Sequence, residues 1–260
     1  MDIFYGVDGT GPDDNNTYAT DFSSSHVRTL WKNWHTPAAG YIRGPSLAGT
    51  ETADRMWKGL SWVKEQWEQA QKNANPAKPN RIFLSGYSRG GAAVIALAYH
   101  LDKADIPVHA MLLFDAVDRS PLLFTDTIPK NVAACYHALR DPKAGSRESF
   151  GNCGRKHAAS VAYTEKHFYC THGGVGGCPW KENGKSGKIE EMDNSTKAAA
   201  IVLMGQPAAN IHDFTNVTVA QDQQGSQASW TWMSQNLTVA RASREAEGIA
   251  PFGIYGKTRE

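Results

Sequence analysis

A serine with a glycine two positions away on each side is the feature of this sequence that most directly predicts chemistry. Residues 86–90 read Gly-Tyr-Ser-Arg-Gly, with Ser88 at the centre. A serine hydroxyl is a weak nucleophile in water, so an enzyme that uses one must expose it on a tight turn beside a base. The two glycines allow such a turn without a Cβ clash. The pattern therefore predicts that Ser88 is a nucleophile.

Two flanking segments supply the elements that such a turn requires. Residues 81–87 form an apolar run typical of a buried strand, and residues 90–102 favour a helix. The same two patterns recur along the chain, as strands at 2–7, 108–114 and 131–139 and as helices at 51–72, 195–204 and 227–247. Continuous apolar strands that alternate with helices indicate a mostly parallel sheet with helices on both faces. We therefore expect an α/β-hydrolase fold, formed by a single domain over residues 1–260.

A serine nucleophile in this fold requires a histidine base, which follows the acidic residue in the chain. His172 comes after a short strand-like run at 167–170 and lies in a glycine-rich loop, from which its side chain can reach the carboxyl edge of the sheet. We expect His172 to be the base. Four other histidines are alternative candidates for the base: His137, His157, His167 and His212. Of these, His212 is the second choice.

The acid of the triad has two main candidates. Asp115 ends the strand at 108–114, and Asp141 lies just past the strand at 131–139. Both positions fall at the carboxyl edge of a parallel sheet, where active sites form. A carboxylate at either position could hold the imidazole in one tautomer and stabilise its cation. We favour Asp115, keep Asp141 as the alternative acid and place Asp118 third.

An oxyanion hole requires two backbone N–H groups that point at the developing negative charge. One is expected from Arg89, the residue after the nucleophile, and the other from a loop that follows an early strand. The loop after residue 7 contains Gly9 and Thr10, whose amides suit the second position. Asp8 is expected to hold this loop in place rather than to take part in the reaction.

The chemistry needs no cofactor, and the sequence predicts neither a cofactor nor a metal site. Residues 8–16 have the composition of a calcium or phosphate loop, but their spacing fits neither an EF-hand nor a P-loop. Five residues could be considered as zinc ligands: His157, His167, Cys170, His172 and Cys178. They contain no closely spaced Cys-x-x-Cys or His-x-x-x-His pair, so a zinc site is not predicted.

The four cysteines are compatible with two disulfides or with four buried thiols, and we favour thiols slightly. They are Cys135, Cys153, Cys170 and Cys178. The last two bracket the glycine-rich loop, so a bridge between them would constrain the predicted base.

Charge and hydropathy argue against several classes of partner. A formal net charge of +1 predicts no nucleic-acid partner. The sequence contains no run of about 18 apolar residues, so it predicts no membrane-spanning helix. The N-terminus has the pattern of a strand rather than of a Sec signal peptide. We therefore expect a cytoplasmic protein, or one exported by a signal-independent route.

Two segments are expected to border the site. Residues 142–166 show no clear period, which predicts a long loop near the active site. Together with residues 31–41, this loop is expected to cover the nucleophile in part.

Several motifs in this order resemble those of one family. VDGTG begins at residue 7, GYSRGGAA at 86, LLFDAVDR at 112, HFYCTHGGVGG at 167 and WTWM at 230. Together they resemble the catalytic domain of the type VI secretion phospholipase effectors and related α/β-hydrolases. The resemblance implies Ser88 as nucleophile, Asp115 as acid and His172 as base, with a lipid ester as substrate and transient contact with a membrane surface. An effector would also have an immunity or secretion partner.

The chain departs from the family pattern at three points. Gly174 stands where the family usually has an aspartate, and Tyr87 replaces the common phenylalanine. The chain is also shorter than the larger effectors, so we expect it to lack their additional membrane-docking region. These departures bear on lipid preference rather than on catalysis.

We expect a serine ester hydrolase of the lipase or phospholipase type that acts through an acyl-enzyme. A non-catalytic binding module with the same fold is one alternative. An amidase, peptidase or acyltransferase that uses the same triad is another, since the fold does not determine the acyl acceptor.

Overall fold

The computed structural model describes residues 1–46, 51–75, 78–118, 123, 125–181, 187–192 and 212–243. At its centre is a sheet of six strands in the order β2-β1-β3-β4-β6-β8, and every neighbouring pair is parallel. The strands are β1 (Asp2–Val7), β2 (Ala39–Ile42), β3 (Arg81–Tyr87), β4 (Val108–Phe114), β6 (Val132–Arg140) and β8 (Ala162–Phe168). This is the predicted α/β-hydrolase sheet, and the fold class is confirmed.

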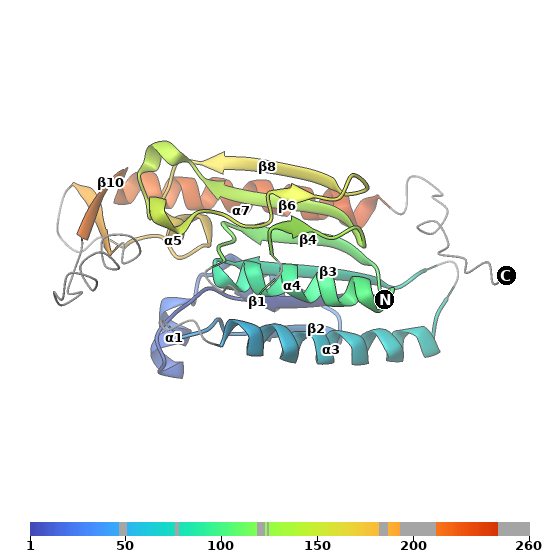
Figure 1. The fold of residues 1–260 in the computed structure, drawn as a ribbon. Coiled ribbons are helices and arrows are strands. Elements are labelled where there is room, and N and C mark those ends of the chain that lie inside the picture. Colours follow the sequence, from blue (N-terminus) through green and yellow to red (C-terminus); the bar gives the residue numbers. More distant parts are fainter. Residues whose placement is uncertain are drawn as a thin grey trace.

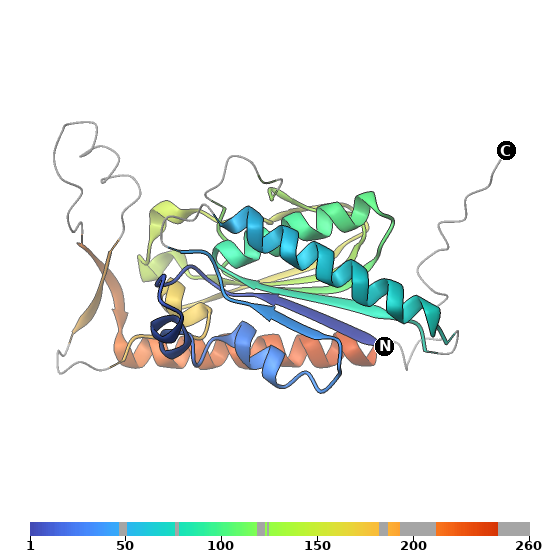
Figure 2. The ribbon, with the colours of Figure 1, turned by 90° about the horizontal axis from the view of Figure 1, so that it is seen from below.

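Helices cover both faces of the sheet (Figure 1). The main ones are α2 (His26–Lys32), α3 (Thr52–Lys72), α4 (Arg89–Lys103) and α7 (Val219–Ala242). Figure 2 shows α3 and α4 on one side of the strands and α2 and α7 on the other. The central strands are apolar without alternation because both of their faces are buried. On β3, Ile82 and Leu84 face the α3 and α4 side, while Phe83 faces the α2 and α7 side.

Shorter elements connect these layers at the carboxyl ends of the strands. They are α1 (Asn15–Asp21), the 3₁₀ helices η1 (Pro142–Ala144) and η2 (Glu148–Phe150), and α5 (His172–Val175). Two small sheets accompany them, one that pairs β5 (Thr127–Ile128) with β7 (Lys156–His157) and one that pairs β9 (Lys188–Met192) with β10 (His212–Thr218).

The predicted loop at 142–166 is wrong at its C-terminal end, because β8 begins at Ala162 and includes residues 162–166. This strand lies at the edge of the sheet and most of its side chains are exposed, so it lacks the continuous apolar run that marks the inner strands. The strand predicted at 167–170 is correspondingly only the end of β8.

The last helix begins eight residues earlier than predicted, at Val219 rather than near 227. A capping box between Thr218 and Gln221 starts it. The first turns bury small and polar side chains instead of apolar ones, which hides the helical period from an analysis of hydropathy. The helix predicted at 195–204 lies outside the described residues. In the part of the chain that the structure describes, none of the helices is both long and apolar enough to cross a membrane.

Candidate active site

Ser88 lies at a sharp turn between β3 and α4 and has φ 54° and ψ −128°, a conformation that non-glycine residues rarely adopt. The turn is held from both sides: its N–H donates to the carbonyl of Phe114, and its carbonyl accepts from Gly91 and Val117. A Cβ on Gly90 would lie 2.2 Å from the carbonyl oxygen of Val7. The glycine after the nucleophile is therefore required by close approach of the β1 backbone.

A continuous hydrogen-bonded chain leads from Ser88 to Asp115. The Oγ atom of Ser88 lies 2.9 Å from Nε2 of His172, and Nδ1 of the same ring lies 2.6 Å from Oδ2 of Asp115. The three side chains come from the end of β3, the start of α5 and the end of β4. The structure thus brings together the three residues that the sequence favoured for a triad.

Asp115 is fully buried and accepts hydrogen bonds from three residues. Besides the imidazole, Nη1 of Arg140 lies 2.5 Å from Oδ2, and Nδ2 of Asn152 lies 2.8 Å from Oδ1. Burial acts to raise the pKa of Asp115, but the Arg140 charge and the His172 hydrogen bond outweigh it. The pKa of this carboxyl therefore lies well below its ordinary value, and Asp115 is a carboxylate at neutral pH.

The pKa of His172 is lowered from its ordinary value. Burial is the largest cause, and the charges of Arg140 and Arg147 add to it, while Asp115 acts in the opposite direction. The ring is therefore neutral at neutral pH, which is the state that can accept a proton from Ser88.

The other acid candidates lie elsewhere. The carboxylate of Asp141 accepts from the N–H of Lys143 at 2.8 Å and caps η1, so the structure does not bring the alternative acid to the imidazole. Asp118 accepts from the hydroxyl of Thr125.

Three of the four alternative histidines have other partners. His137 is buried, and its Nε2 accepts from the N–H of Ala116 at 3.1 Å. His157 stacks on Tyr163, and His167 lies 3.8 Å from Glu165. His212 begins β10, in a separate two-stranded sheet.

The loop after β1 lies against the turn that carries Ser88. Nη1 of Arg89 donates to the hydroxyl of Thr10 at 3.1 Å, so Arg89 contacts one of the two loop residues predicted to supply the second oxyanion donor. The N–H of Gly9, in contrast, donates to Oδ1 of Asp8 at 2.9 Å. Asp8 is fully buried and also accepts from Ser25 and Tyr41, which fixes the loop in place.

The site is almost closed in this structure, since Ser88 is 5% and His172 3% exposed. The ring of Phe150 packs edge-on against the imidazole at 5.4 Å, so the first half of the 142–166 segment does border the site. In the 31–41 segment, Trp34 is buried in the core, where it stacks on Phe4, while the hydroxyl of Tyr41 donates to Asp8 in the loop after β1.

Three residues around the triad were missed by the analysis of the sequence: Arg140, Ser146 and Asn152. Arg140 ends β6, the strand beside β4, so its position next to Asp115 could have been inferred from strand order. Ser146, whose Oγ accepts from the N–H of His172 at 2.8 Å, and Asn152 lie in irregular segments that carry no such signal.

The histidines and cysteines of this region were also considered as metal ligands and, for the cysteines, as disulfide partners. Among the described residues, no group of three His, Cys, Asp or Glu side chains could hold a metal ion. All four cysteines are free thiols, so Cys170 and Cys178 are not bridged.

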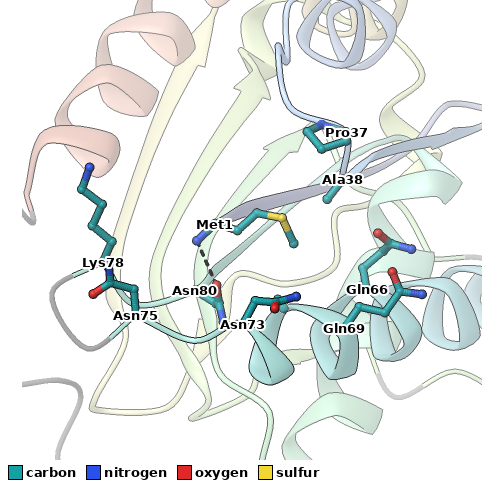
Figure 3. A pocket seen from close by; sticks show the side chains of 10 residues that line it. Met1, Pro37, Ala38, Gln66, Gln69, Asn73, Asn75, Lys78 and Asn80 are labelled. Atoms are coloured by element: carbon teal, nitrogen blue, oxygen red, sulfur yellow. Dashed lines mark hydrogen bonds between the residues drawn. The ribbon is translucent and has the colours of Figure 1, made fainter.

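A cavity of about 360 Å³ lies at the opposite edge of the sheet, where β1 and β3 begin (Figure 3). Amide side chains line much of it: Gln66, Gln69, Asn73, Asn75 and Asn80. Because the triad lies at the carboxyl ends of the strands, this cavity is separate from the candidate active site.

No protein-family model and no curated protein matches the chain. Among solved structures, an uncharacterized protein from Pseudomonas aeruginosa is 14% identical with a TM-score of 0.39 over 67% of this chain, which spans 41% of that protein. A cutinase-like protein from Cryptococcus sp. is 15% identical (TM-score 0.27, 49% of this chain and 60% of that one). An acetyl xylan esterase is 14% identical (TM-score 0.27, 66% and 90%).

These likenesses are too weak to support an argument about function, and none bears on the resemblance to type VI secretion effectors. The assignment of the fold rests on the strand order and on the turn at Ser88. On that sheet, a serine, an imidazole and a carboxylate are hydrogen-bonded in the order that serine hydrolases use.

Proposed function

We propose that the protein is a serine hydrolase that cleaves carboxylic esters through an acyl-enzyme. The observation that carries the proposal is the hydrogen-bonded chain from Ser88 through His172 to Asp115, with the serine held on a strained turn. Backbone strain of this kind persists where the surrounding structure enforces it, and it is common at active sites.

In the first half of the reaction, Nε2 of His172 takes the hydroxyl proton of Ser88 as Oγ attacks the ester carbonyl carbon. The imidazolium that forms is stabilised by Asp115, which accepts the Nδ1 proton in a hydrogen bond without taking it. His172 then gives its Nε2 proton to the alkoxide leaving group, and the acyl group remains on Ser88. In the second half, water attacks the acyl-enzyme with His172 again acting first as base and then as acid.

The oxyanion of each tetrahedral intermediate would accept hydrogen bonds from the N–H groups of Arg89 and Thr10. Thr10 is preferred to Gly9 as the second donor because the Gly9 amide already donates to Asp8. The contact between the Arg89 side chain and the Thr10 hydroxyl would hold the two donors at a constant separation.

The substrate is proposed to be a lipid-like ester. The rings of Phe150 and Tyr87 lie at 5.4 and 5.1 Å from the imidazole ring, so the acyl group would meet apolar surroundings. The motif resemblance favours a phospholipid. Contact with a membrane surface and an immunity or secretion partner stay predictions that depend on that resemblance.

Hydrolysis of p-nitrophenyl esters of short and long acyl chains tests the proposal. Wild-type protein should release p-nitrophenol and Ser88→Ala should not, and wild type alone should be labelled by a fluorophosphonate probe. Equal hydrolysis by both proteins would remove Ser88 from the mechanism. Labelling of Ser88 without ester hydrolysis would instead favour an amidase or acyltransferase, which amide substrates and added alcohols would then reveal.

A further inference from the structure

Both ends of the loop that carries His172 converge on one carboxylate of α7. The N–H of Thr171 donates to Oδ1 of Asp222 at 2.7 Å, and the N–H of Trp180 donates to Oδ2 at 2.8 Å. Asp222 is 0% exposed. One side chain therefore connects the residue before the imidazole to the residue at which the chain leaves the loop.

A buried carboxylate is costly to place unless its oxygens are hydrogen-bonded. Burial raises the pKa of Asp222, and the N–H groups of Trp180 and Thr171 act against that shift. These partners are backbone amides on the histidine loop rather than groups of α7 itself. An apolar side chain in the same place would avoid the cost of burying a charge, but it would leave both amides without an acceptor, so the chemical role of the carboxylate is to fix the two amides.

The loop needs such an anchor because its sequence does little to hold it. Residues 173–177 include four glycines, and glycine has more conformational freedom to lose than any other residue. The helix that begins at His172, α5, has only four residues. Its own cap is a single bond from the N–H of Gly174 to the hydroxyl of Thr171, at 3.0 Å.

The face of α7 that meets the loop allows the backbones to approach closely. Asp222, Gly225 and Ser229 are buried and lie at helical spacing. The hydroxyl of Ser229 donates to the carbonyl of Val175 at 3.1 Å. A Cβ on Gly174 would lie 2.3 Å from Oδ1 of Asp222, so the carboxylate occupies the space that a side chain at 174 would need.

We propose that Asp222 is a positioning residue for the base, which keeps Nε2 of His172 within hydrogen-bond distance of Ser88. It acts through the N–H groups of Thr171 and Trp180 and does not touch the substrate. The inference deepens the proposed function and rests on it for its kinetic consequences, while its structural consequence can be measured on its own.

Loss of the carboxylate should affect turnover more than substrate binding. Asp222→Ala leaves both loop amides without their acceptor, whereas the oxygen of Asp222→Asn can still accept from one of them. A displacement of about 1 Å in a catalytic group costs on the order of 100-fold in rate. We expect kcat to fall about 100-fold in Asp222→Ala and about 10-fold in Asp222→Asn, with KM within about twofold of wild type.

Thr218→Ala provides the matched control. It removes the capping box of the same helix and destabilises α7, but Thr218 has no bond to the histidine loop. Its urea midpoint should fall, and its kcat should stay as in wild type. The two variants are compared at equal loss of stability. If kcat falls further in Asp222→Asn than in Thr218→Ala, the difference is due to the position of His172.

The second readout is the proton on Nδ1 of His172, which is expected far downfield in ¹H NMR because it is hydrogen-bonded to Asp115. The signal is assigned by its loss in His172→Ala. It should be sharp in wild type and Thr218→Ala and broadened by exchange with water in Asp222→Asn. If wild-type protein hydrolysed no ester, the proposed function would be refuted, and the NMR signal alone would decide whether Asp222 positions His172. A folded Asp222→Asn or Asp222→Ala with wild-type kcat and a sharp signal would overturn the inference.

Discussion

Arg140 and His172 bind the same oxygen atom of Asp115. Nη1 of the guanidinium lies 2.5 Å and Nδ1 of the imidazole 2.6 Å from Oδ2, and all three side chains are buried. The carboxylate therefore holds a permanent cation beside the group that becomes a cation during the reaction. This arrangement keeps Asp115 ionised. The Arg140 charge also lowers the pKa of His172, so the imidazole is a weaker base than it would be in a triad without the arginine.

Replacement of Arg140 by methionine should move the acid limb of the pH profile of kcat/KM to higher pH. The Arg140 charge lowers the pKa of His172, so its removal raises that pKa, and more of the imidazole is protonated and inactive in mild acid. We expect a shift of about one pH unit. The loss of one partner from a buried pair should also destabilise the fold by about 3 kcal/mol, measurable by urea unfolding.

Arg140→Lys is the control, because it keeps the charge and loses the second guanidinium arm that bonds the carbonyl oxygens of Arg147 and Gly151. Its acid limb should stay close to that of wild type even where kcat falls. The same upward shift in both variants would show that geometry, and not charge, sets the basicity of the imidazole.

The pair Asp115→Asn and Asp141→Asn distinguishes the two acids that the sequence left open. An asparagine at 115 cannot hold the Nδ1 proton as the carboxylate does, and we expect kcat to fall by about 10³- to 10⁴-fold. At position 141 an asparagine can still cap η1, so activity should stay within about twofold of wild type and stability within about 0.5 kcal/mol. Single-turnover acylation with a p-nitrophenyl ester measures the activity of both variants, and urea unfolding measures their stability. A large loss in Asp141→Asn alone would reverse the assignment.

The sequence was most informative where local chemistry and strand order both restrict the residues. Ser88 could be placed on a sharp turn because the glycines on both sides permit one, and Gly90 proves to lie against the β1 backbone. Asp115 could be placed because a carboxylate that ends an inner strand of a parallel sheet must reach the edge where Ser88 lies. His172 followed from chain order and from the glycines beside it.

Other elements left no such trace. The edge strand β8 reads as irregular because one row of its side chains faces water and the other is only partly covered. The start of α7 reads as a polar loop because its buried face carries Asp222 and Ser226, which are chosen for hydrogen bonding and close approach rather than for hydropathy. Asn152 reaches Asp115 from an irregular segment, and only tertiary structure brings the two together.

In wild-type protein, activity should persist below the pH at which an ordinary histidine is half protonated. The pKa of His172 is lowered mainly by burial, so the neutral base survives into mild acid. The acid limb of kcat/KM should therefore have an apparent pKa below about 6.5. Measurement from pH 4 to 8 with a p-nitrophenyl ester decides this, with the rate of fluorophosphonate labelling as a check that does not depend on product release. An apparent pKa above 7 would contradict the expected effect of burial.

Asp8 should make the fold less stable as pH rises through the range in which this residue ionises. Burial raises the pKa of Asp8 from 3.8 to about 6, despite hydrogen bonds from Ser25, Gly9 and Tyr41. Well below pH 4 the group is protonated in both states, and above pH 6 the folded state carries a charge that the unfolded state accommodates more easily. A shift of about two pKa units corresponds to about 3 kcal/mol. The free energy of unfolding of Asp8→Asn, relative to wild type, should therefore rise by about this amount between pH 4 and pH 7.

The control for Asp8 is Asp14→Asn, whose wild-type carboxylate is exposed and caps α1. Its pKa is lowered by hydrogen bonds from Thr17, so the charged form stabilises the fold and that contribution is lost as pH falls. Relative to wild type, Asp14→Asn should become less stable as pH rises, which is the opposite slope. Urea unfolding at several pH values measures both variants. If their free energies of unfolding relative to wild type changed with pH in the same direction, Asp8 would not be the group that ionises near pH 6.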